Sequence, residues 1–391
     1  MTFNEIKEND TKYIVNTYAR FPVALKSGKG ATAVDFDGRK YIDFTSGIGV
    51  NSLGFCDDDY VKAVSEQLAG LQHTSNLYYT EPQVLLAKTL CERTGMSEAF
   101  FANSGAEANE GAIKTARKYS FMKYGEGRST IVTLENSFHG RTITTLSATG
   151  QDVFHNFFFP FTDGFVFAKA NDIDDTLSKL TDDVAAVMLE MVQGEGGVLP
   201  LSKEYVTAVA RACKQKDILL IVDEVQTGVG RTGTLFAYEQ YGVEPDLVTF
   251  AKGIGGGLPL GGVLFNSSTE SVLVFGDHAT TFGGNPAVCA GANTVLKKLD
   301  EKFLSEVRKK GDYIRNKISK MPRVKEISGL GMMIGVSLDG VEAKQVVSEG
   351  LKNGVILLTA KTKLRLLPPL SISCGEIDEG LAALETTLNS F

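Results

Sequence analysis

Lys252 is the residue whose surroundings most favour covalent chemistry. It follows the apolar run Leu247–Ala251 and precedes a loop of small residues, Gly253–Gly257. A lysine held out of water near another cation has a lowered pKa, so its amine is neutral and can act as the nucleophile that forms a Schiff base. An exposed lysine at the end of a strand is the commoner interpretation of Lys252 taken alone.

Asp223 ends a second apolar run, Ile218–Val222. This run is apolar on both faces of a predicted strand, so the Asp223 carboxylate is expected to be poorly solvated. An unpaired charge there costs free energy, and a cationic partner such as a protonated pyridine nitrogen removes that cost. A structural salt bridge or a helix cap is the alternative, and Asp223 in isolation favours it.

A third segment, Ala102–Asn109, has the pattern of an anion site. A strand ends, Ser104, Gly105 and Ala106 form a turn of small residues, and an Ala-rich helix continues to about Tyr119. The free N–H groups and the positive dipole end of such a helix can bind a phosphate without Lys or Arg. An ordinary N-cap at Ser104 is the alternative. The order of phosphate cradle, buried acid and lysine favours one joint site.

These residues need a scaffold that brings strand ends together. Short apolar runs alternate with helical patterns, which predicts an α/β fold with a mostly parallel sheet wrapped by helices. The predicted strands are 99–103, 130–135, 186–190, 218–223, 247–251 and 262–265, and two predicted helices are 57–71 and 82–94. Four runs end in Ser104, Glu190, Asp223 or Lys252, and open α/β sheets bind ligands at such ends, so one shared pocket is expected. For any one of these four residues the alternative is that a polar side chain simply ends the strand and has no role in a site.

The pattern changes from about residue 290, where a smaller α+β domain is expected. It has a helix near 301–320, a strand over 332–338, a helix near 343–352, two short strands and a closing helix with Ile377, Leu381, Leu384 and Leu388. The predicted division is an N-terminal segment over 1–45 that packs with the small domain, a large domain over 46–286 and the small domain over 287–391.

Composition restricts the partners and the compartment. The chain has 391 residues, a formal net charge of −7 and 43% hydrophobic residues, which suits a globular protein and disfavours nucleic acid or anionic membranes as partners. Its five cysteines are far apart with no zinc-like spacing, so buried free thiols in a reducing compartment are expected. The start is polar, without a signal-peptide core, and no apolar run approaches a membrane span, so a cytoplasmic protein is expected.

Six stretches together resemble the class III, fold type I aminotransferases over nearly the whole length. They are Tyr41–Asn51, Asn103–Asn109, Ser137–Thr142, Gln193–Gly197, Asp223–Gly228 and Thr280–Pro286. The resemblance implies a large domain that binds pyridoxal phosphate, a smaller α+β domain, and transfer of the terminal amino group of N2-acetyl-L-ornithine to 2-oxoglutarate. Ornithine, succinylated donors and 4-aminobutyrate remain open as alternatives within the class, as does an aminomutase.

The resemblance also implies roles for residues of the cofactor site. Lys252 would hold the cofactor covalently, Asp223 would keep its ring nitrogen protonated, and Gln226 would bond its phenolic oxygen. Phe138 and Val225 would press on the two ring faces, and Glu190 would lie near the ring. The phosphate would bind at the helix start, on Gly105 and Ala106 after Ser104, with Thr281 reaching in from a second subunit. The dimer would therefore be the catalytic unit.

Two arginines suit the substrate carboxylates that the resemblance implies. Arg141 would bind the carboxylate far from the reacting amine, and Arg365 the one beside it. Glu195 would pair with Arg365 when the donor has no carboxylate there, and Thr280 would touch the donor. The sequence departs from the family at Phe55–Asp59, in the region that shapes the substrate entrance, and at Met191, where a proline is usual.

Gly228–Gly233 matches the GxGxxG pattern, so a nicotinamide-dependent oxidoreductase is an alternative function. A dinucleotide site needs its glycines directly at the strand end and at the start of a helix. Here Glu224–Thr227 intervene and no helical pattern follows Arg231. A purely binding or structural protein is a second alternative, but it leaves Lys252 and Asp223 unexplained.

Overall fold

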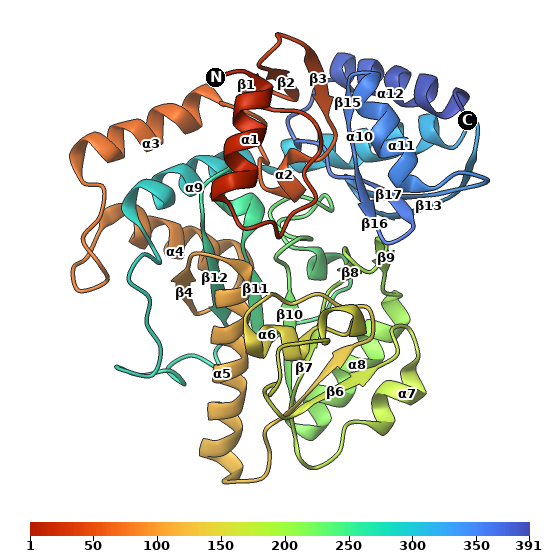
Figure 1. Ribbon diagram of the computed structural model, residues 1–391. Helices are drawn as coiled ribbons and strands as arrows, with labels where there is room; N and C mark the ends of the chain where they lie inside the picture. Colours follow the sequence, from red (N-terminus) through yellow and green to blue (C-terminus); the bar gives the residue numbers. More distant parts are fainter.

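A computed structural model describes residues 1–391. Its central element is a seven-stranded sheet (Figure 1). The order across the sheet is β4 (Glu98–Ala102), β12 (Gly261–Phe265), β11 (Leu247–Phe250), β10 (Leu219–Asp223), β7 (Val184–Leu189), β5 (Thr130–Leu134) and β6 (Phe165–Ala168). Only β12 runs antiparallel to its neighbours, so the carboxyl ends of the other six strands meet at one edge.

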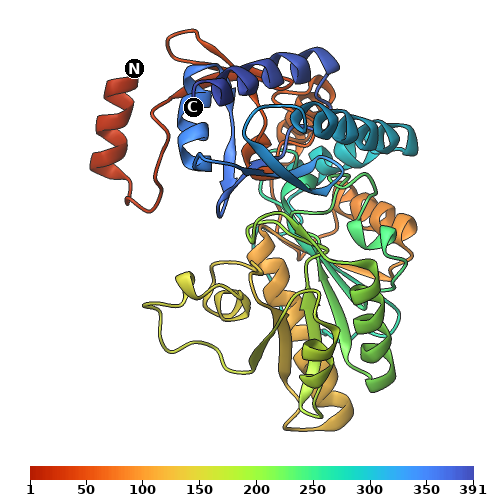
Figure 2. The same cartoon turned by 90° about the vertical axis from the view of Figure 1, so that its right-hand side faces the viewer.

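Alternate residues of this sheet are buried against opposite layers. Leu219 and Ile221 of β10 pack with the face of α5 (Gly105–Tyr124) that carries Ala112 and Ile113. The residues between them, Leu220 and Val222, belong to the core that includes one side of α8 (Lys203–Lys216). Figure 2 shows α5 and α8 on the two sides of the sheet. This arrangement explains why the central strands are apolar on both faces.

Two smaller sheets lie at the other end of the molecule. One is antiparallel, in the order β13 (Val324–Leu330), β14 (Met333–Leu338), β17 (Lys363–Leu366) and β16 (Leu358–Ala360). The other joins β1 (Leu25–Lys29), β2 (Thr32–Asp35) and β3 (Lys40–Asp43) to β15 (Val355–Ile356). Both contain strands from the last part of the chain, and three helices contribute buried residues there: α10 (Glu301–Ile318), α11 (Ala343–Lys352) and α12 (Cys374–Asn389).

Three helices pack beside the β4 edge of the large sheet: α3 (Asp58–Gly70), α4 (Glu81–Thr94) and α9 (Pro286–Lys298). The short helices are α2 (Ser46–Gly49), α6 (Ile143–Ala148), α7 (Ile173–Ser178), η1 (Asp152–Phe154), η2 (Ala237–Gln240) and η3 (Lys252–Gly255), and β8 (Val192–Gln193) pairs with β9 (Leu199–Pro200). The N-terminal helix α1 (Phe3–Tyr13) buries none of its residues and stands apart from the body of the chain in Figure 2. No helix has both the length and the apolar composition that a membrane crossing requires.

The α/β class and the predicted strands of the large sheet are confirmed, with bounds that differ by one or two residues. The helices predicted at 57–71 and 82–94 are α3 and α4. Helix α3 begins after its Asp57 cap, and α4 ends at Gly95, which has a left-handed conformation. The prediction of buried cysteines is wrong in part, because Cys56 and Cys374 are exposed and only Cys213 and Cys289 are fully buried; all five are free.

Candidate active site

A cavity of about 450 Å³ opens at the carboxyl edge of the large sheet. Ser104, Glu190, Asp223 and Lys252, which end four of the predicted strands, all line it. The prediction of one pocket fed by several strand ends is therefore confirmed. Gly105, Ala106, Phe138, Arg141, Val225 and Gln226 from the predicted site also line this cavity.

Lys252 lies two residues beyond the end of β11, at the first position of η3. Its backbone has φ +47°, a left-handed conformation that costs free energy for a residue with a side chain and that often occurs at functional sites. The side chain forms neither a salt bridge nor a hydrogen bond with the protein. Burial lowers the pKa of Lys252, opposed by the nearby carboxylates of Glu195 and Asp223. The amine is thus poised to be neutral and unengaged.

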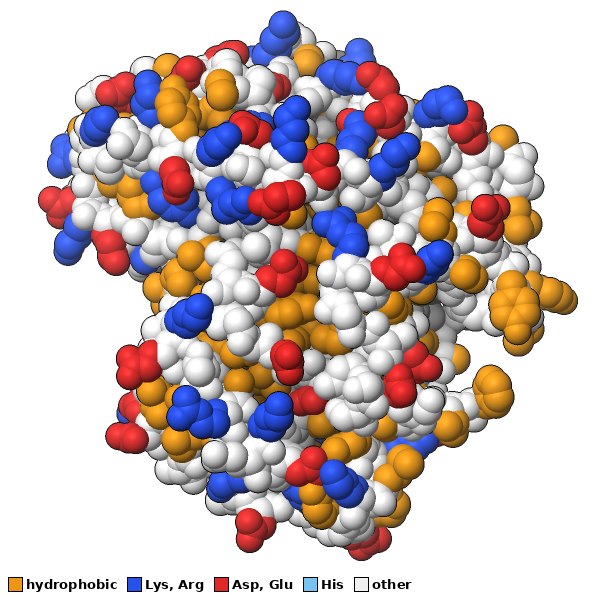
Figure 3. Space-filling view, turned by 180° about the vertical axis from the view of Figure 1, so that it is seen from behind, with side chains coloured by type: hydrophobic (Ala, Val, Ile, Leu, Met, Phe, Trp, Pro, Cys, Tyr) orange, Lys and Arg blue, Asp and Glu red, His pale blue; other side chains and the backbone are white.

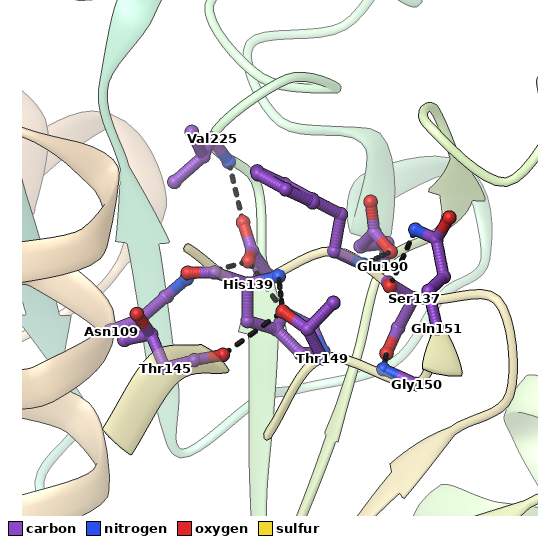
Figure 4. A network of polar contacts seen from close by, with 11 residues as sticks. Asn109, Ser137, His139, Thr145, Thr149, Gly150, Gln151, Glu190 and Val225 are labelled. Carbon is purple, nitrogen blue, oxygen red and sulfur yellow. Dashed lines mark hydrogen bonds and ion pairs between the residues drawn. The ribbon is translucent and has the colours of Figure 1, made fainter. Parts of the chain in front are cut away.

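Asp223 is buried at the end of β10 and accepts three hydrogen bonds (Figure 4). Oδ2 accepts from Asn109 Nδ2 at 2.8 Å and is 2.8 Å from His139 Nδ1, and Oδ1 accepts from the Val225 backbone N–H at 3.0 Å. No Lys or Arg pairs with this carboxylate. Since a carboxylate offers about four acceptor positions, Oδ1 keeps one free for a cationic donor in the cavity.

Asn109 and His139 were not singled out by the sequence interpretation, although both lie inside stretches that carry the family resemblance. Their partner Asp223 is 114 and 84 residues away in the sequence. His139 Nε2 and Asn109 Oδ1 are buried without a hydrogen-bond partner. Only the fold brings these side chains to the carboxylate.

The start of α5 has the geometry of an anion site. Ser104 Oγ caps the helix by accepting from the Glu107 N–H at 3.2 Å, so the N-cap is present, and this cap leaves the predicted anion site available. The N–H groups of Gly105 and Ala106, at the first two helical positions, have no carbonyl of their own helix to bond. A Cβ on Gly105 would lie 2.6 Å from Val225 Cγ1, so glycine is required for this approach.

Phe138, Glu190 and Val225 surround the middle of the cavity. The Phe138 backbone N–H donates to Glu190 Oε2 at 3.1 Å, which fixes the loop that carries the ring. Burial, and secondarily the nearby Asp223 carboxylate, raise the pKa of Glu190 well above its ordinary value. The raised pKa favours the neutral form of Glu190, which limits the negative charge buried beside Asp223.

Gln226 connects the cavity to a buried ion pair. Arg365 NH1 lies 2.5 Å from Glu195 Oε1 and 3.2 Å from Gln226 Oε1, and Gln226 Nε2 donates to Glu195 Oε1 at 3.3 Å. Burial acts to raise the pKa of Glu195, but the Arg365 guanidinium outweighs it and the net shift is downward. Glu195 and Arg365 do not line the cavity itself, yet the predicted pairing between them is present. Arg365 Nε is buried with no partner.

The remaining predicted residues lie at the rim or beyond it. Arg141 lines the cavity, is exposed, and pairs with no acidic side chain. Thr280 lies outside the lining but accepts a hydrogen bond at 3.0 Å from Asn103 Nδ2, and Asn103 does line it. Thr281 is exposed and does not reach the cavity of its own chain.

The residues present fit pyridoxal phosphate. The free N–H groups of Gly105 and Ala106 suit a phosphate, and the open position on Asp223 Oδ1 suits a protonated ring nitrogen. Lys252 supplies an unengaged amine in the same cavity. Phe138 and Val225 supply apolar surface for a flat ring.

The oxidoreductase alternative is wrong. No helix follows Gly228–Gly233 before the short η2, so the glycines open no phosphate-binding helix. Arg231, within this stretch, is buried and donates from NH1 to the Met332 and Pro368 carbonyls at 3.1 and 2.6 Å. The stretch therefore joins the large sheet to the C-terminal strands.

The expected influence of Phe55–Asp59 on the substrate entrance has no counterpart in the cavity, whose lining includes none of these residues. Asp57 caps α3 and pairs with Lys298, and the Phe55 ring packs against Gly28. The other departure, Met191, is fully buried in the core. Both departures contribute to packing.

Comparison with known proteins gives one consistent result. The sequence model of the family described as Aminotransferase class-III matches residues 13–388. The chain is 55% identical to acetylornithine aminotransferase of Haemophilus ducreyi over 391 residues, which is 100% of both chains. Among solved structures it resembles N-acetylornithine aminotransferase of Stenotrophomonas maltophilia, with 34% identity, a TM-score of 0.86 and 99% of each chain covered. It also resembles ornithine aminotransferase of Toxoplasma gondii, described with partial occupancy of PLP at the active site, with 31% identity, a TM-score of 0.93, and 100% and 95% of the two chains covered.

Proposed function

The chain belongs to the class III aminotransferases, which use pyridoxal phosphate, and from this premise we propose that it transfers the terminal amino group of N2-acetyl-L-ornithine to 2-oxoglutarate, a reaction of arginine biosynthesis. The full-length identity with an acetylornithine aminotransferase supports the donor. The Glu195–Arg365 pair is the observation on which the geometric argument depends.

Pyridoxal phosphate, when bound, supplies a ring that withdraws electrons from the carbon bearing the transferred amine. Asp223 Oδ1 would accept a hydrogen bond from the ring nitrogen and keep it protonated. Asn109 and His139 fix the other carboxylate oxygen, so Asp223 cannot rotate away. Gly105 and Ala106 would hold the phosphate, and Gln226 would bond the phenolic oxygen.

Lys252 would hold the cofactor through its Nζ. Once the substrate amine has displaced this Nζ, the released amine would take the proton from the substrate carbon that carries the transferred amine, which requires that Lys252 be neutral. Burial lowers the pKa of Lys252 in the direction that this task requires.

The Glu195–Arg365 pair lets one site accept two unlike substrates. The pair is formed in the structure, with Arg365 NH1 2.5 Å from Glu195 Oε1. Acetylornithine has no carboxylate beside its terminal amine, so Glu195 can keep Arg365 neutralised while this donor is bound. 2-Oxoglutarate has a carboxylate at that position, so Glu195 must release Arg365, whose planar fork then binds it through two parallel hydrogen bonds. Arg141 binds the distant carboxylate of either substrate.

Rapid-mixing spectroscopy of the two half-reactions tests this assignment. Arg365→Ala is expected to slow the 2-oxoglutarate half tenfold or more and to leave the acetylornithine half largely intact, since truncating one partner of a buried charge pair typically costs about 2–5 kcal/mol. Arg141→Ala is expected to weaken both halves. Lys363→Ala is the control, because Lys363 lies on the same strand as Arg365 but donates to Ser328 of β13 and does not line the cavity. Equal losses in both halves for Arg365→Ala would contradict the assignment.

Ornithine is the main competing donor, since the chain superposes on an ornithine aminotransferase at a TM-score of 0.93. The fold therefore does not discriminate between the donors. Steady-state kcat/KM values for acetylornithine, ornithine, N-succinylated donors and 4-aminobutyrate on the same enzyme preparation decide between them. A preference for ornithine would contradict the proposed donor and leave the class unchanged.

A homodimer is part of the proposed function. Asn76 Nδ2 donates to the Thr280 and Gly283 carbonyls, so the loops around them form one surface that also carries Thr281. Leu77, Tyr79 and Phe282 are exposed here, and Tyr79 is fully accessible. Figure 3 shows hydrophobic side chains protruding at the edge of the molecule that lies on the left in Figure 1. Exposed apolar surface of this kind suits a second subunit, into whose cavity Thr281 would reach.

We propose the same domain division as the sequence predicts: an N-terminal segment over 1–45, a large domain over 46–286 and a small domain over 287–391. The pairing of β3 with β15 supports assigning the first segment to the C-terminal domain. Expressing 46–286 alone, and measuring whether it binds pyridoxal phosphate, tests the large-domain boundary.

A further inference from the structure

Arg141 is the one proposed carboxylate-binding residue that no acidic side chain holds in place. It is exposed, it lines the cavity, and it takes part in no salt bridge. A long, exposed arginine has many rotamers, and ordering it on a substrate costs entropy. A contact that restricts Arg141 before the substrate binds would lower this cost without using an ion pair.

Two aromatic rings lie beside the Arg141 guanidinium, where an acidic partner would otherwise be expected. The Arg141 guanidinium carbon lies 4.1 Å from the centroid of the Phe154 ring and 5.4 Å from that of Phe138. The shorter distance is to Phe154, so the main cation–π contact is with this ring. Such a contact uses the face of the guanidinium and leaves its N–H edge free for a carboxylate, whereas an acidic partner would occupy that edge.

Phe154 is held by the backbone of its own loop. Its N–H donates to the Gln151 carbonyl at 3.0 Å, and the buried Gln151 side chain donates to the Ser137 carbonyl at 3.0 Å. Ser137 Oγ in turn accepts from the Gly150 N–H at 3.0 Å, and Figure 4 shows Ser137, Gly150 and Gln151 together. The Phe154 ring also meets the Phe138 ring edge-on, with centroids 5.9 Å apart.

We propose that Phe154 is a positioning residue for the carboxylate site: its ring holds the Arg141 guanidinium over the cavity mouth with its hydrogen-bonding edge open. The proposal rests on the assignment of Arg141 to the distant substrate carboxylate. Phe154 is consequently a determinant of specificity for acids over the matching neutral compounds, and it acts on both half-reactions because both substrates use Arg141.

Binding of an unreactive probe to the holoenzyme tests the proposal without turnover. N2-Acetyl-L-norvaline has the acetylated amino acid end of the proposed donor but no terminal amine, and its carboxamide is the neutral match. Calorimetry is expected to show tighter binding of the acid than of the amide by the wild-type enzyme. Phe154→Leu, which keeps apolar volume and removes the aromatic face, is expected to reduce that preference about tenfold.

Phe154→Tyr is expected to restore the preference, because the ring face is retained. Phe157→Leu, a change at an exposed ring of the same loop, is the matched control and should leave both affinities unchanged. The cofactor absorption spectrum and cofactor affinity should be unaltered in Phe154→Leu. In steady state, its KM for 2-oxoglutarate should rise about tenfold while kcat changes little.

Three results would overturn the proposal. One is an unchanged preference for acid over amide in Phe154→Leu; another is an equal loss for acid and amide, which indicates general damage to the cavity. The third is loss of cofactor with the preference retained, which would indicate that Phe154 supports the Phe138 ring at the cofactor site and does not position Arg141. If the wild-type enzyme failed to transaminate acetylornithine but showed the expected acid preference and its loss, the proposed donor would be wrong and the role of Phe154 would stand.

Discussion

Lys252 and Asp223 are ionisable groups of the cavity that bond no oppositely charged Lys, Arg, Asp or Glu side chain. The ring of His139 is the one titratable partner of Asp223. Lys252 has no hydrogen-bond partner in the protein, and the Asp223 carboxylate is held by an amide, an imidazole and a backbone N–H. Unpaired ionisable groups in a cavity are costly to folding, so their presence together indicates a ligand that satisfies both.

Replacing Lys252 by Ala is expected to abolish turnover while the protein still folds. The substitution removes both the covalent attachment of the cofactor and the base that moves the substrate proton. Steady-state assays and the chain mass after borohydride reduction measure the two losses separately. Lys344→Ala, a change at an exposed helix position, is the control. Residual turnover near the wild-type value would refute the assignment of Lys252.

Replacing Asp223 by Asn is expected to lower kcat strongly and to change cofactor affinity much less. The amide keeps the shape of the carboxylate but cannot hold the ring nitrogen in its protonated form, while the phosphate cradle at Gly105 and Ala106 is untouched. Parallel measurements of kcat and of the cofactor Kd check this. Unchanged kcat together with lost cofactor binding would show that Asp223 serves attachment only.

The sequence could predict Asp223 and Lys252 because a charge that ends an apolar run is a local signal. His139 and Asn109 gave no such signal, since their importance depends on a contact with Asp223 that no local pattern records. The same holds for the Phe154 contact with Arg141. The side chains that ligands are expected to touch were predictable, and those that hold them in place were not.

At the scale of elements, hydrogen bonds to the Glu224 side chain stabilise the turn that carries Asp223, Val225 and Gln226. Its fully buried carboxylate accepts from Thr227 Oγ1 at 2.5 Å and from the Tyr238 backbone N–H at 2.8 Å. The turn after β10 is thereby joined to η2. Burial raises the pKa of Glu224 to about 7 from an ordinary value of 4.5.

Glu224→Gln is expected to make thermal stability less sensitive to pH between about pH 5 and 8. A raised pKa in the folded state means that the native protein binds the proton more tightly than the unfolded chain does. The stabilisation is complete below pH 4.5 and is lost as the pH rises through about 7, a change of about 3 kcal/mol. Gln cannot titrate, so the Tm of the variant relative to wild type should rise with pH.

Measurements of Tm at several pH values, with Glu244→Gln at an exposed position as the control, provide the comparison. A Tm difference that stays constant from pH 5 to 8 would contradict the protonation of Glu224 in the native state. Catalysis is a separate readout, because Glu224 does not line the cavity.

Element positions were predictable where hydrophobic periodicity is strong, as in β10 and β11. The reversed direction of β12 was not, because an apolar run has the same pattern in either direction and only its partners β11 and β4 define it. Strands β1–β3 were also missed. They are short, and β1 is largely exposed, so they lack the apolar alternation that marks a strand.

At the scale of the whole molecule, the proposed site includes Thr281, which a single chain does not bring to its own cavity. That residue is exposed on a surface loop beside Phe282, away from the cavity of its own subunit. The helix α1 likewise buries none of its residues within the single chain. The sequence could suggest the dimer only through resemblance, since an interface between copies has no local pattern of its own.

Hybrid dimers test whether Thr281 acts across the interface. A Thr281→Ala homodimer is expected to lose about tenfold in cofactor affinity, through one lost hydrogen bond to the phosphate in a desolvated site. A Lys252→Ala homodimer is expected to be inactive. In a hybrid dimer, one subunit carries Thr281→Ala and the other carries Lys252→Ala. The subunit that keeps Lys252 then receives the intact Thr281 of its partner, so one of the two sites is complete. Hybrids purified with two different affinity tags should therefore show about half of wild-type activity at low cofactor concentration. If Thr281 acted within its own chain, the only site with Lys252 would lack Thr281, and the hybrid would be no better than the Thr281→Ala homodimer per active lysine. Such a result would overturn the shared site while leaving the assignments of Lys252 and Asp223 in place.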